Sequence, residues 1–170
     1  DIYAAEAAFV LKYAQGDGAG FAAAYEDLGI DMSKVKSAEI APYSVEIGTR
    51  PSDGKVVALG YQATGGAFIY RRSIAKDVWG TDDPATVKAK IGGGSGSWDQ
   101  FWVAAEELKA KGYGIISGDG DLWHAVENSS PKGWVVDGKL NIDPKREEFL
   151  DLSKKLKDNG YHNDTQDWQD

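Results

Sequence analysis

Two pairs of neighbouring carboxylates have the residue types needed for glycoside chemistry. Glu106 and Glu107 are adjacent in "VAAEELKA", and Asp119 and Asp121 occur in "SGDGD". Glycoside hydrolysis needs an acid and a nucleophile or base held about 5 to 9 Å apart. Glu106 and Glu107 are consecutive on a predicted helix, so their side chains should point in different directions. We therefore predict no catalytic residues and a protein that is not an enzyme. A glycoside-processing enzyme domain is the alternative.

Aromatic residues are abundant and offer a different chemistry, the binding of a sugar. A pyranose packs its C–H faces on aromatic rings and needs hydroxyl partners at fixed places. The chain has six Trp and eight Tyr, and Trp123 follows "SGDGD", where a predicted strand passes into a helix. Asp119 and Asp121 either cap that helix or accept sugar hydroxyls. Trp134 is predicted to pack in a hairpin. Four other aromatic residues are expected in the core: Phe68, Tyr70, Phe101 and Trp102.

Composition narrows the classes of ligand. The chain has 170 residues, a formal net charge of -8, no Cys and two His. Scattered basic residues on an acidic chain disfavour nucleic acid and anionic membranes as partners, whereas a neutral or cationic ligand fits. Without cysteine and with two distant histidines, we expect no metal site and no cofactor. No run of about 18 apolar residues is present, so no membrane span is expected.

The elements that position these residues alternate between α and β patterns, which favours a layered α/β architecture. A mostly buried helix is predicted in "EAAFVLKYAQGDG", up to Gly16. Strands are predicted at 56–64, after the turn "PSDGK", and at 67–75, and a short buried strand at 113–118. Further helices are predicted at 82–91, 97–112, 121–130 and 143–160, with a hairpin at 133–142 around Asp137-Gly138. Ser97 is the predicted N-cap of the 97–112 helix, and Asp119 or Asp121 begins the next one. The low-complexity segment "GGGSGS" is a predicted surface loop.

Several segments carry a family resemblance that covers nearly the whole chain. They are "DIYAAEAAFVLKY", "YSVEIGTRPSDGKVVALGYQATGGAFIYRRSIAKDVWGTDDP", "SWDQFWVAAEELKAKGYGIISGDGDLW", "WVVDGKLNIDP" and "DNGYHNDTQDW". In this order they resemble the extracellular solute-binding proteins of sugar ABC transporters. The resemblance implies a periplasmic-binding-protein-like (type II) architecture of two α/β lobes. Family members are about twice as long or more, so we expect an internal fragment, with part of the N-terminal lobe and the hinge at 1–66 and a portion of the C-terminal lobe at 67–170.

The resemblance also implies a function. Such a protein captures an oligosaccharide in the cleft between its lobes and delivers it to the permease subunits of an ABC importer. It acts as a monomer outside the cytoplasmic membrane, as a periplasmic protein or a cell-surface lipoprotein. A binding protein of the same fold for another solute, such as a peptide, is the alternative within this class. The isolated chain is expected to bind sugar weakly, because it would hold only part of the cleft.

The resemblance and the residue types together define the expected site. Gly65 and Gly66 lie where the chain would cross between lobes, and we interpret them as a hinge that absorbs backbone rotation, with an ordinary strand bulge as the alternative. Trp168 matches a tryptophan of the family's W-x-x-x-W element near the cleft. The predicted ligand-binding residues are Tyr3, Glu6, Gln62, Thr64, Asp119, Asp121, Trp123 and Trp168.

Overall fold

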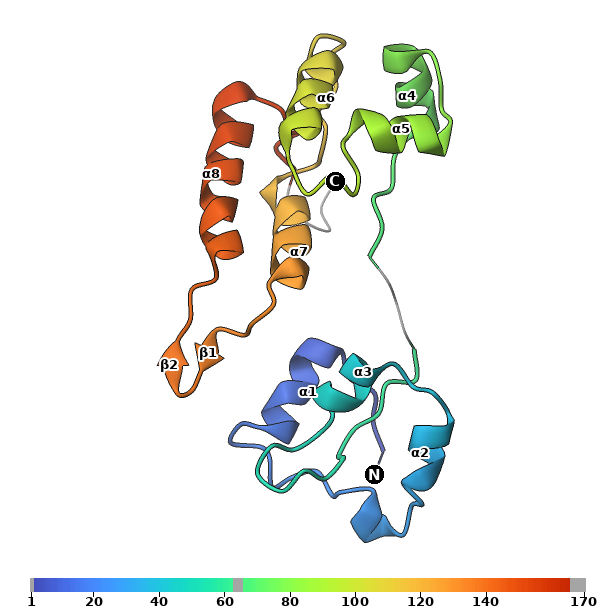
Figure 1. Cartoon of the computed structure of the whole chain (residues 1–170), viewed down its shortest axis with the longest axis vertical. Coiled ribbons are helices and arrows are strands. Elements are labelled where there is room, and N and C mark those ends of the chain that lie inside the picture. The colour runs from blue at the N-terminus through green and yellow to red at the C-terminus, as the bar shows by residue number, and fades with distance from the viewer. Residues whose placement is uncertain (1, 63–65, 166–170) are drawn as a thin grey trace. The chain divides into compact units, whose positions relative to one another are not determined.

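A computed structural model describes residues 2–62 and 66–165, which fall into two compact units (Figure 1). The N-terminal unit comprises Asp1–Phe68 and the C-terminal unit Ile69–Asp170. In the described residues helices predominate, and the one sheet has two strands. The two-lobe α/β architecture and the assignment of 1–66 and 67–170 to its lobes stay predictions.

The N-terminal unit is built from short helices joined by irregular chain. Its elements are α1 (Ala7–Ala14), the 3-10 helix η1 (Glu26–Leu28), α2 (Ser33–Ser37) and α3 (Pro42–Ile47). Pro42 occupies the first turn of α3, where its missing N–H has no helical partner to lose. The predicted turn at 51–55 is confirmed, because Thr49 and Val56 form an antiparallel bridge on either side of it.

The prediction that the first helix is mostly buried is wrong. Only Ala14 of α1 is buried, whereas Phe9 is 58% and Leu11 43% exposed. The cluster of buried apolar residues in this unit is small: Ala14, Ala24 and Val57. The helix packs against α3, which has six residues and covers only part of the apolar surface of α1.

In the described residues of 56–64 and in 67–75, the two predicted strands do not form. Val56 makes its single bridge, residues 66–71 are irregular, and α4 (Arg72–Trp79) occupies the end of the second segment. A strand must pair its backbone with a neighbouring strand, and without one the helical preference of "RSIAKDVW" decides the local conformation. Arg72 starts this helix and forms an ion pair with Asp82.

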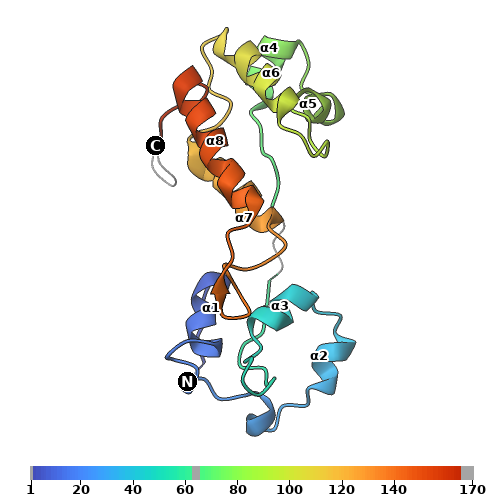
Figure 2. The ribbon, with the colours of Figure 1, turned by 60° about the vertical axis from the view of Figure 1, so that its left-hand side comes forward.

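The C-terminal unit contains the longer helices. After α4 come α5 (Pro84–Lys90), α6 (Asp99–Lys109), α7 (Asp119–Ser129), β1 (Val135–Val136), β2 (Lys139–Leu140) and α8 (Pro144–Asn159). The four helices predicted from 82 onward are thereby confirmed, and "GGGSGS" is a loop as predicted. Figures 1 and 2 both show α7 beside α8, and these two helices make the most extensive contact between elements.

The predicted hairpin is also confirmed, and its turn chemistry explains it. Val135 pairs with Leu140 and Val136 with Lys139 in antiparallel register. The two turn residues have positive φ, 51° at Asp137 and 72° at Gly138. Asp-Gly is a preferred sequence for a two-residue turn of this kind, because glycine takes the left-handed conformation without steric cost.

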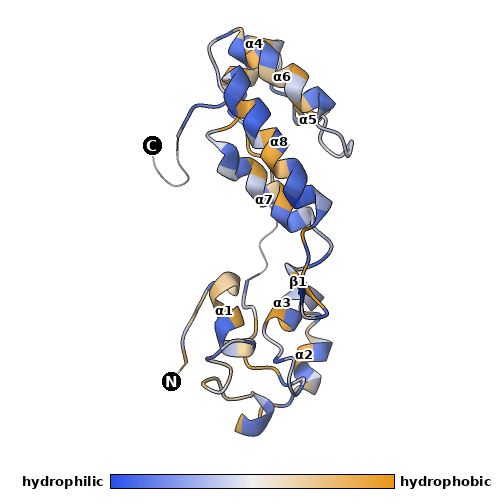
Figure 3. Cartoon of the chain, turned by 90° about the vertical axis from the view of Figure 1, so that its left-hand side faces the viewer, coloured by the Kyte–Doolittle hydropathy of each residue, from blue (hydrophilic) through white to orange (hydrophobic). Residues whose placement is uncertain are grey.

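One aromatic core holds the C-terminal unit together. Its buried members come from α6, α7, α8 and the residue that follows α8: Phe101, Trp102, Ala105, Leu122, Val126, Leu152, Leu156 and Tyr161. Blue and orange residues alternate along α8 in Figure 3, as expected for a helix with one buried face. The core positions predicted for Phe101 and Trp102 are therefore confirmed. Phe68 is 49% exposed, so its prediction is wrong, and Tyr70 is half-buried.

Two local predictions in this unit need correction. The segment 113–118 is half-buried and forms a single parallel bridge, between Ile116 and His162, instead of a strand. The N-cap of α6 is Trp98, not Ser97. The Ser97 hydroxyl oxygen accepts the backbone N–H of Asp99 at 3.1 Å, which closes a local turn before the helix.

Candidate ligand-binding site

The described ligand-binding candidates of the N-terminal unit, Tyr3, Glu6 and Gln62, make contacts local to α1 or face solvent. Tyr3 is 61% exposed and meets the ring of Tyr13 edge-on, with 5.7 Å between ring centroids. Glu6 is the N-cap of α1, and its backbone carbonyl accepts the N–H of Phe9 and of Val10. Gln62 is exposed. Thr64 and Trp168, as well as the predicted hinge residue Gly65, lie outside the described residues.

Gly66 is described, and its surroundings do not require glycine. A Cβ atom built at this position would meet no atom within 4 Å, and Gly66 is not among the glycines with positive φ. The hinge at Gly65 and Gly66 stays a prediction, as does the bulge alternative.

Asp119 and Asp121 lie in the first turn of α7, as the sequence indicates. The N-cap of the helix is Gly118, and it makes no side-chain cap. The Asp121 carboxylate accepts the backbone N–H of Ser117 at 3.0 Å, so Asp121 closes the turn that enters the helix. Asp119 is the first residue of α7 and is exposed. Both carboxylates also lie at the N-terminus of α7, where the positive end of the helix dipole stabilises negative charge.

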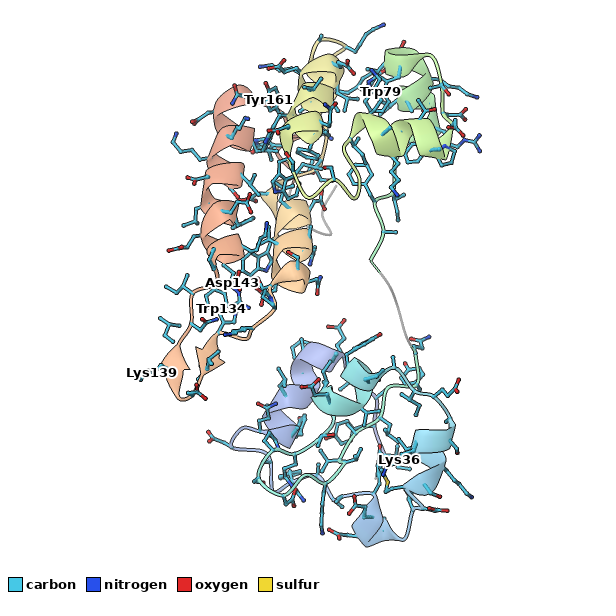
Figure 4. The ribbon with its side chains drawn as sticks, in the orientation of Figure 1. Lys36, Trp79, Trp134, Lys139, Asp143 and Tyr161 are labelled. Carbon is cyan, nitrogen blue, oxygen red and sulfur yellow. The ribbon has the colours of Figure 1, made fainter. Side chains whose placement is uncertain are left out.

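Trp123 lies beside a second tryptophan, Trp134, which the sequence predicts to pack in the hairpin. The Trp123 ring meets Phe149 edge-on at 5.1 Å and lies 6.4 Å from the Trp134 ring at an angle of 32°. Trp123 is half-buried against the aromatic core. Trp134, just before β1, is 43% exposed and is therefore not a core residue. Figure 4 places Trp134 near Asp143, where the hairpin leads into α8.

An ion pair between the buried Arg146 and the half-buried Glu127 fixes the orientation of Trp134. The Arg146 guanidinium donates through Nε to Glu127 Oε2 at 2.8 Å and through Nη2 to Oε1 at 3.2 Å. The indole Nε1–H of Trp134 donates to Glu127 Oε1 at 3.2 Å, and the centre of the guanidinium lies 4.1 Å from the Trp134 ring centroid. The side chain of Arg146 is only 4% exposed. We call Trp123, Glu127, Trp134 and Arg146 the indole site.

Electrostatics support the charged state of this pair. The hydrogen bonds from Arg146 lower the pKa of the Glu127 carboxyl below its usual value, and those same bonds raise the pKa of Arg146. Asp143 is buried beside them and caps α8 by accepting the N–H of Lys145 at 2.9 Å. Bidentate pairing with a rigid guanidinium holds both side chains in one geometry.

The arrangement combines a partly exposed indole with a carboxylate that has spare acceptor capacity. An exposed indole offers an apolar surface for the C–H face of a pyranose. The Glu127 carboxylate has about four acceptor positions, of which the three bonds named above use three, so one remains for a sugar hydroxyl.

Spacing in the sequence contained a signal for this site. Trp123 and Glu127 are four residues apart on α7, and Arg146 and Phe149 are three apart on α8, so each pair lies on one helix face. What the sequence did not reveal is that the hairpin returns Trp134 to these two faces.

Two surface hollows lie elsewhere in the units. One, of about 460 Å³, lies between α2 and α3 and is lined mainly by apolar residues, among them Val35, Ile40 and Val45. The other, of about 410 Å³, is lined by Val78, Trp79, Lys90, Glu107, Ala110 and Lys111. The residues of the indole site line neither hollow.

The acidic pair Glu106 and Glu107 points to different neighbours, as the sequence predicts. Glu106 accepts the Tyr161 hydroxyl at 3.1 Å, whereas Glu107 accepts the indole N–H of Trp79. Within residues 2–62 and 66–165, no group of three or more His, Asp or Glu is placed to hold a metal ion. No helix of this described part is long and apolar enough to cross a bilayer.

Comparison with known proteins yields no match: neither a protein-family model, nor a curated protein, nor a solved structure is significantly similar to this chain.

Proposed function

We propose that this chain is part of the carbohydrate-binding component of an ABC sugar importer. In this function the protein captures an oligosaccharide outside the cytoplasmic membrane and presents it to the permease. The sequence resemblance supports the proposal. The observation that carries it is the indole site, where the exposed Trp134 is held in place by Glu127 and Arg146.

The proposed mechanism is capture without chemistry on the sugar. The open surface of Trp134 packs on a pyranose while Glu127 accepts a hydroxyl. Because the indole is already fixed by a hydrogen bond and by the guanidinium, little side-chain freedom is lost on binding. In the importer, contacts from both lobes would favour a closed state that the permease recognises.

A titration observed at the indole N–H groups tests the proposal. The chain is labelled with ¹⁵N, the Trp134 indole signal is assigned with a Trp134→Phe variant, and maltose, cellobiose and lactose are added up to tens of millimolar. We expect at least one sugar to shift the Trp134 signal saturably, with a Kd of about 1 to 10 mM, as suits a small neutral ligand on one subsite.

Matched variants separate stacking on Trp134 from weak general contact. Trp134→Ala should abolish the saturable shift of the neighbouring Trp123 signal. Tyr43→Ala removes a ring that is exposed to a similar degree, 52%, in the N-terminal unit and should leave the shift unchanged. A Trp134 signal that responds to a dipeptide and to none of the sugars would replace the carbohydrate proposal with the peptide alternative.

A further inference from the structure

The hollow around Trp79 combines an apolar wall with charges of both signs. Trp79 and Val78 belong to the end of α4, and Glu107 lies on α6. Figure 4 shows Trp79 on the side of α4 that faces α6. The volume of about 410 Å³ is within the range of small-molecule sites. The hollow can therefore accommodate a ligand with an apolar side and a charged end.

One hydrogen bond sets the orientation of the indole in this hollow. The Nε1–H of Trp79 donates to Glu107 Oε2 at 2.5 Å. The other carboxylate oxygen, Oε1, lies 3.4 Å from the Lys90 ammonium. With about four acceptor positions on a carboxylate, Glu107 retains capacity for a further donor.

The two ion pairs at the hollow are loose. Charge-assisted N–H···O bonds are usually 2.7 to 2.9 Å long. The Lys90–Glu107 pair measures 3.4 Å, and the Lys111–Asp77 pair at the rim measures 3.7 Å. The side chains of Lys90 and Glu107 are 43% and 38% exposed, so solvent and solutes reach both. Each ammonium has three N–H donors, which leaves donors for a ligand after one ion pair.

We propose that this hollow binds a free amino acid with an apolar side chain. The ligand's α-ammonium group donates to Glu107, its carboxylate accepts from Lys90 and Lys111, and its side chain packs on Trp79, Val78 and Ala110. The lining carries two lysines and one carboxylate, Glu107, and Lys111 is paired with Asp77 beside the hollow, so groups of both signs are available to the two charged ends of a zwitterion. The proposal is independent of the indole site and of sugar binding.

Three probes that differ by a single charged group test it on the wild-type chain. Phenylalanine carries both groups, 3-phenylpropionate lacks the ammonium, and phenethylamine lacks the carboxylate. We expect phenylalanine to shift the ¹⁵N indole signal of Trp79, assigned with a Trp79→Phe variant, and to bind at least about tenfold more tightly than either analogue. Equal affinity for one analogue, or no shift of the Trp79 signal, overturns the proposal.

Variants then test the individual contacts. Glu107→Gln and Lys90→Met should each weaken phenylalanine binding about tenfold, because each removes one of the three charged partners proposed for the ligand. Lys88→Met removes an exposed ammonium from the same helix outside the lining of the hollow and should leave the affinity unchanged. If Lys88→Met weakens phenylalanine binding as much as Lys90→Met, loss of any nearby positive charge has the same effect, and the proposed contact with Lys90 is refuted. Far-UV circular dichroism checks that each variant folds, and the analogue comparison on the wild type does not depend on any variant.

Discussion

The two units of this chain differ in how much apolar surface they bury. The cluster of buried residues in the N-terminal unit consists of Ala14, Ala24 and Val57, all of them small or medium-sized. The C-terminal unit buries eight residues in one cluster, among them three large aromatic side chains, Phe101, Trp102 and Tyr161. Since hydrophobic stabilisation grows with the apolar area removed from water, we expect the C-terminal unit to hold most of the folding free energy.

This difference shows that an apolar sequence pattern marks residues that can be buried but does not tell whether a partner surface covers them. The residues of α1 are as apolar as a core helix, yet Phe9 and Leu11 stay exposed, because the short helix α3 and nearby irregular chain with Ala24 and Val57 cover only part of its surface. In contrast, α8 is a polar helix overall, and it buries Leu152 and Leu156 on the face along which α7 lies, while Leu150 on another face is 67% exposed.

The largest expected effect is a loss of stability in the better-packed C-terminal unit. Leu156 is 1% exposed in the centre of the core, and Leu156→Ala should lower the free energy of unfolding of the C-terminal unit by about 3 kcal/mol, through lost burial and a cavity. Urea titration followed by tryptophan fluorescence measures the change.

Hydrogen exchange shows whether the two units unfold separately. In Leu156→Ala, amides of α7 and α8 should exchange faster while amides of α1 keep their wild-type rates. An equal acceleration in α1 would mean that both units unfold as one, and the comparison would fail.

A smaller effect is expected at the indole site. Glu127→Gln leaves Arg146, which is 4% exposed, without its charged partner and should cost about 2 kcal/mol, the range for hydrogen bonds to charged groups. Trp134 should lose its fixed orientation at the same time. The chemical shift of its indole N–H signal should therefore move toward the value of a solvent-exposed indole.

The same pair predicts a pH dependence. Arg146 lowers the pKa of Glu127 in the folded state below its unfolded value, so this contribution to stability is fully present above the unfolded pKa of about 4.5. It is lost as the pH falls through the lower folded pKa. Urea midpoints measured between pH 7 and pH 3 should fall more steeply at the acid end in the wild type than in Glu127→Gln. Parallel curves for the two proteins would contradict the role of the pair.

The smallest expected effects compare two glycines. Gly80 caps α4 with φ at 72°, a conformation that strains other residues, so Gly80→Ala should destabilise by about 1 kcal/mol. A Cβ atom at Gly66 would meet open space, and Gly66 has no positive φ. Gly66→Ala should therefore be neutral or stabilise the protein by about 0.5 kcal/mol, because alanine lowers the conformational entropy of the unfolded chain. A loss of more than 1 kcal/mol in Gly66→Ala, in the same thermal melts, would show that the backbone there needs glycine.

The candidate site was predictable in part. Trp123 of the indole site lies on a helix that the sequence marks clearly, and the helix forms at that place. Asp119 and Asp121 begin the same helix, and their role as sugar ligands stays a prediction. Trp134 is predicted to pack, and its ring does lie beside Trp123 and the Arg146 guanidinium. Its 43% exposure was not predictable, because it depends on where the hairpin lies against α7 and α8. The prediction of Tyr3 and Gln62 as ligand contacts depends on the family resemblance, and their described surroundings add no support for a shared site.

Local chemistry in the sequence determined the helices from residue 82 onward and the Asp137-Gly138 hairpin. Caps, turn residues and apolar spacing act over a few residues, so they can be read without knowing the fold. Only the tertiary structure decided that 67–75 is not a strand, that α1 stays largely exposed, and that Arg146, Glu127 and Trp134 meet. Strand pairing, burial and buried ion pairs each need a partner from a distant part of the chain, and no local pattern specifies which partner arrives.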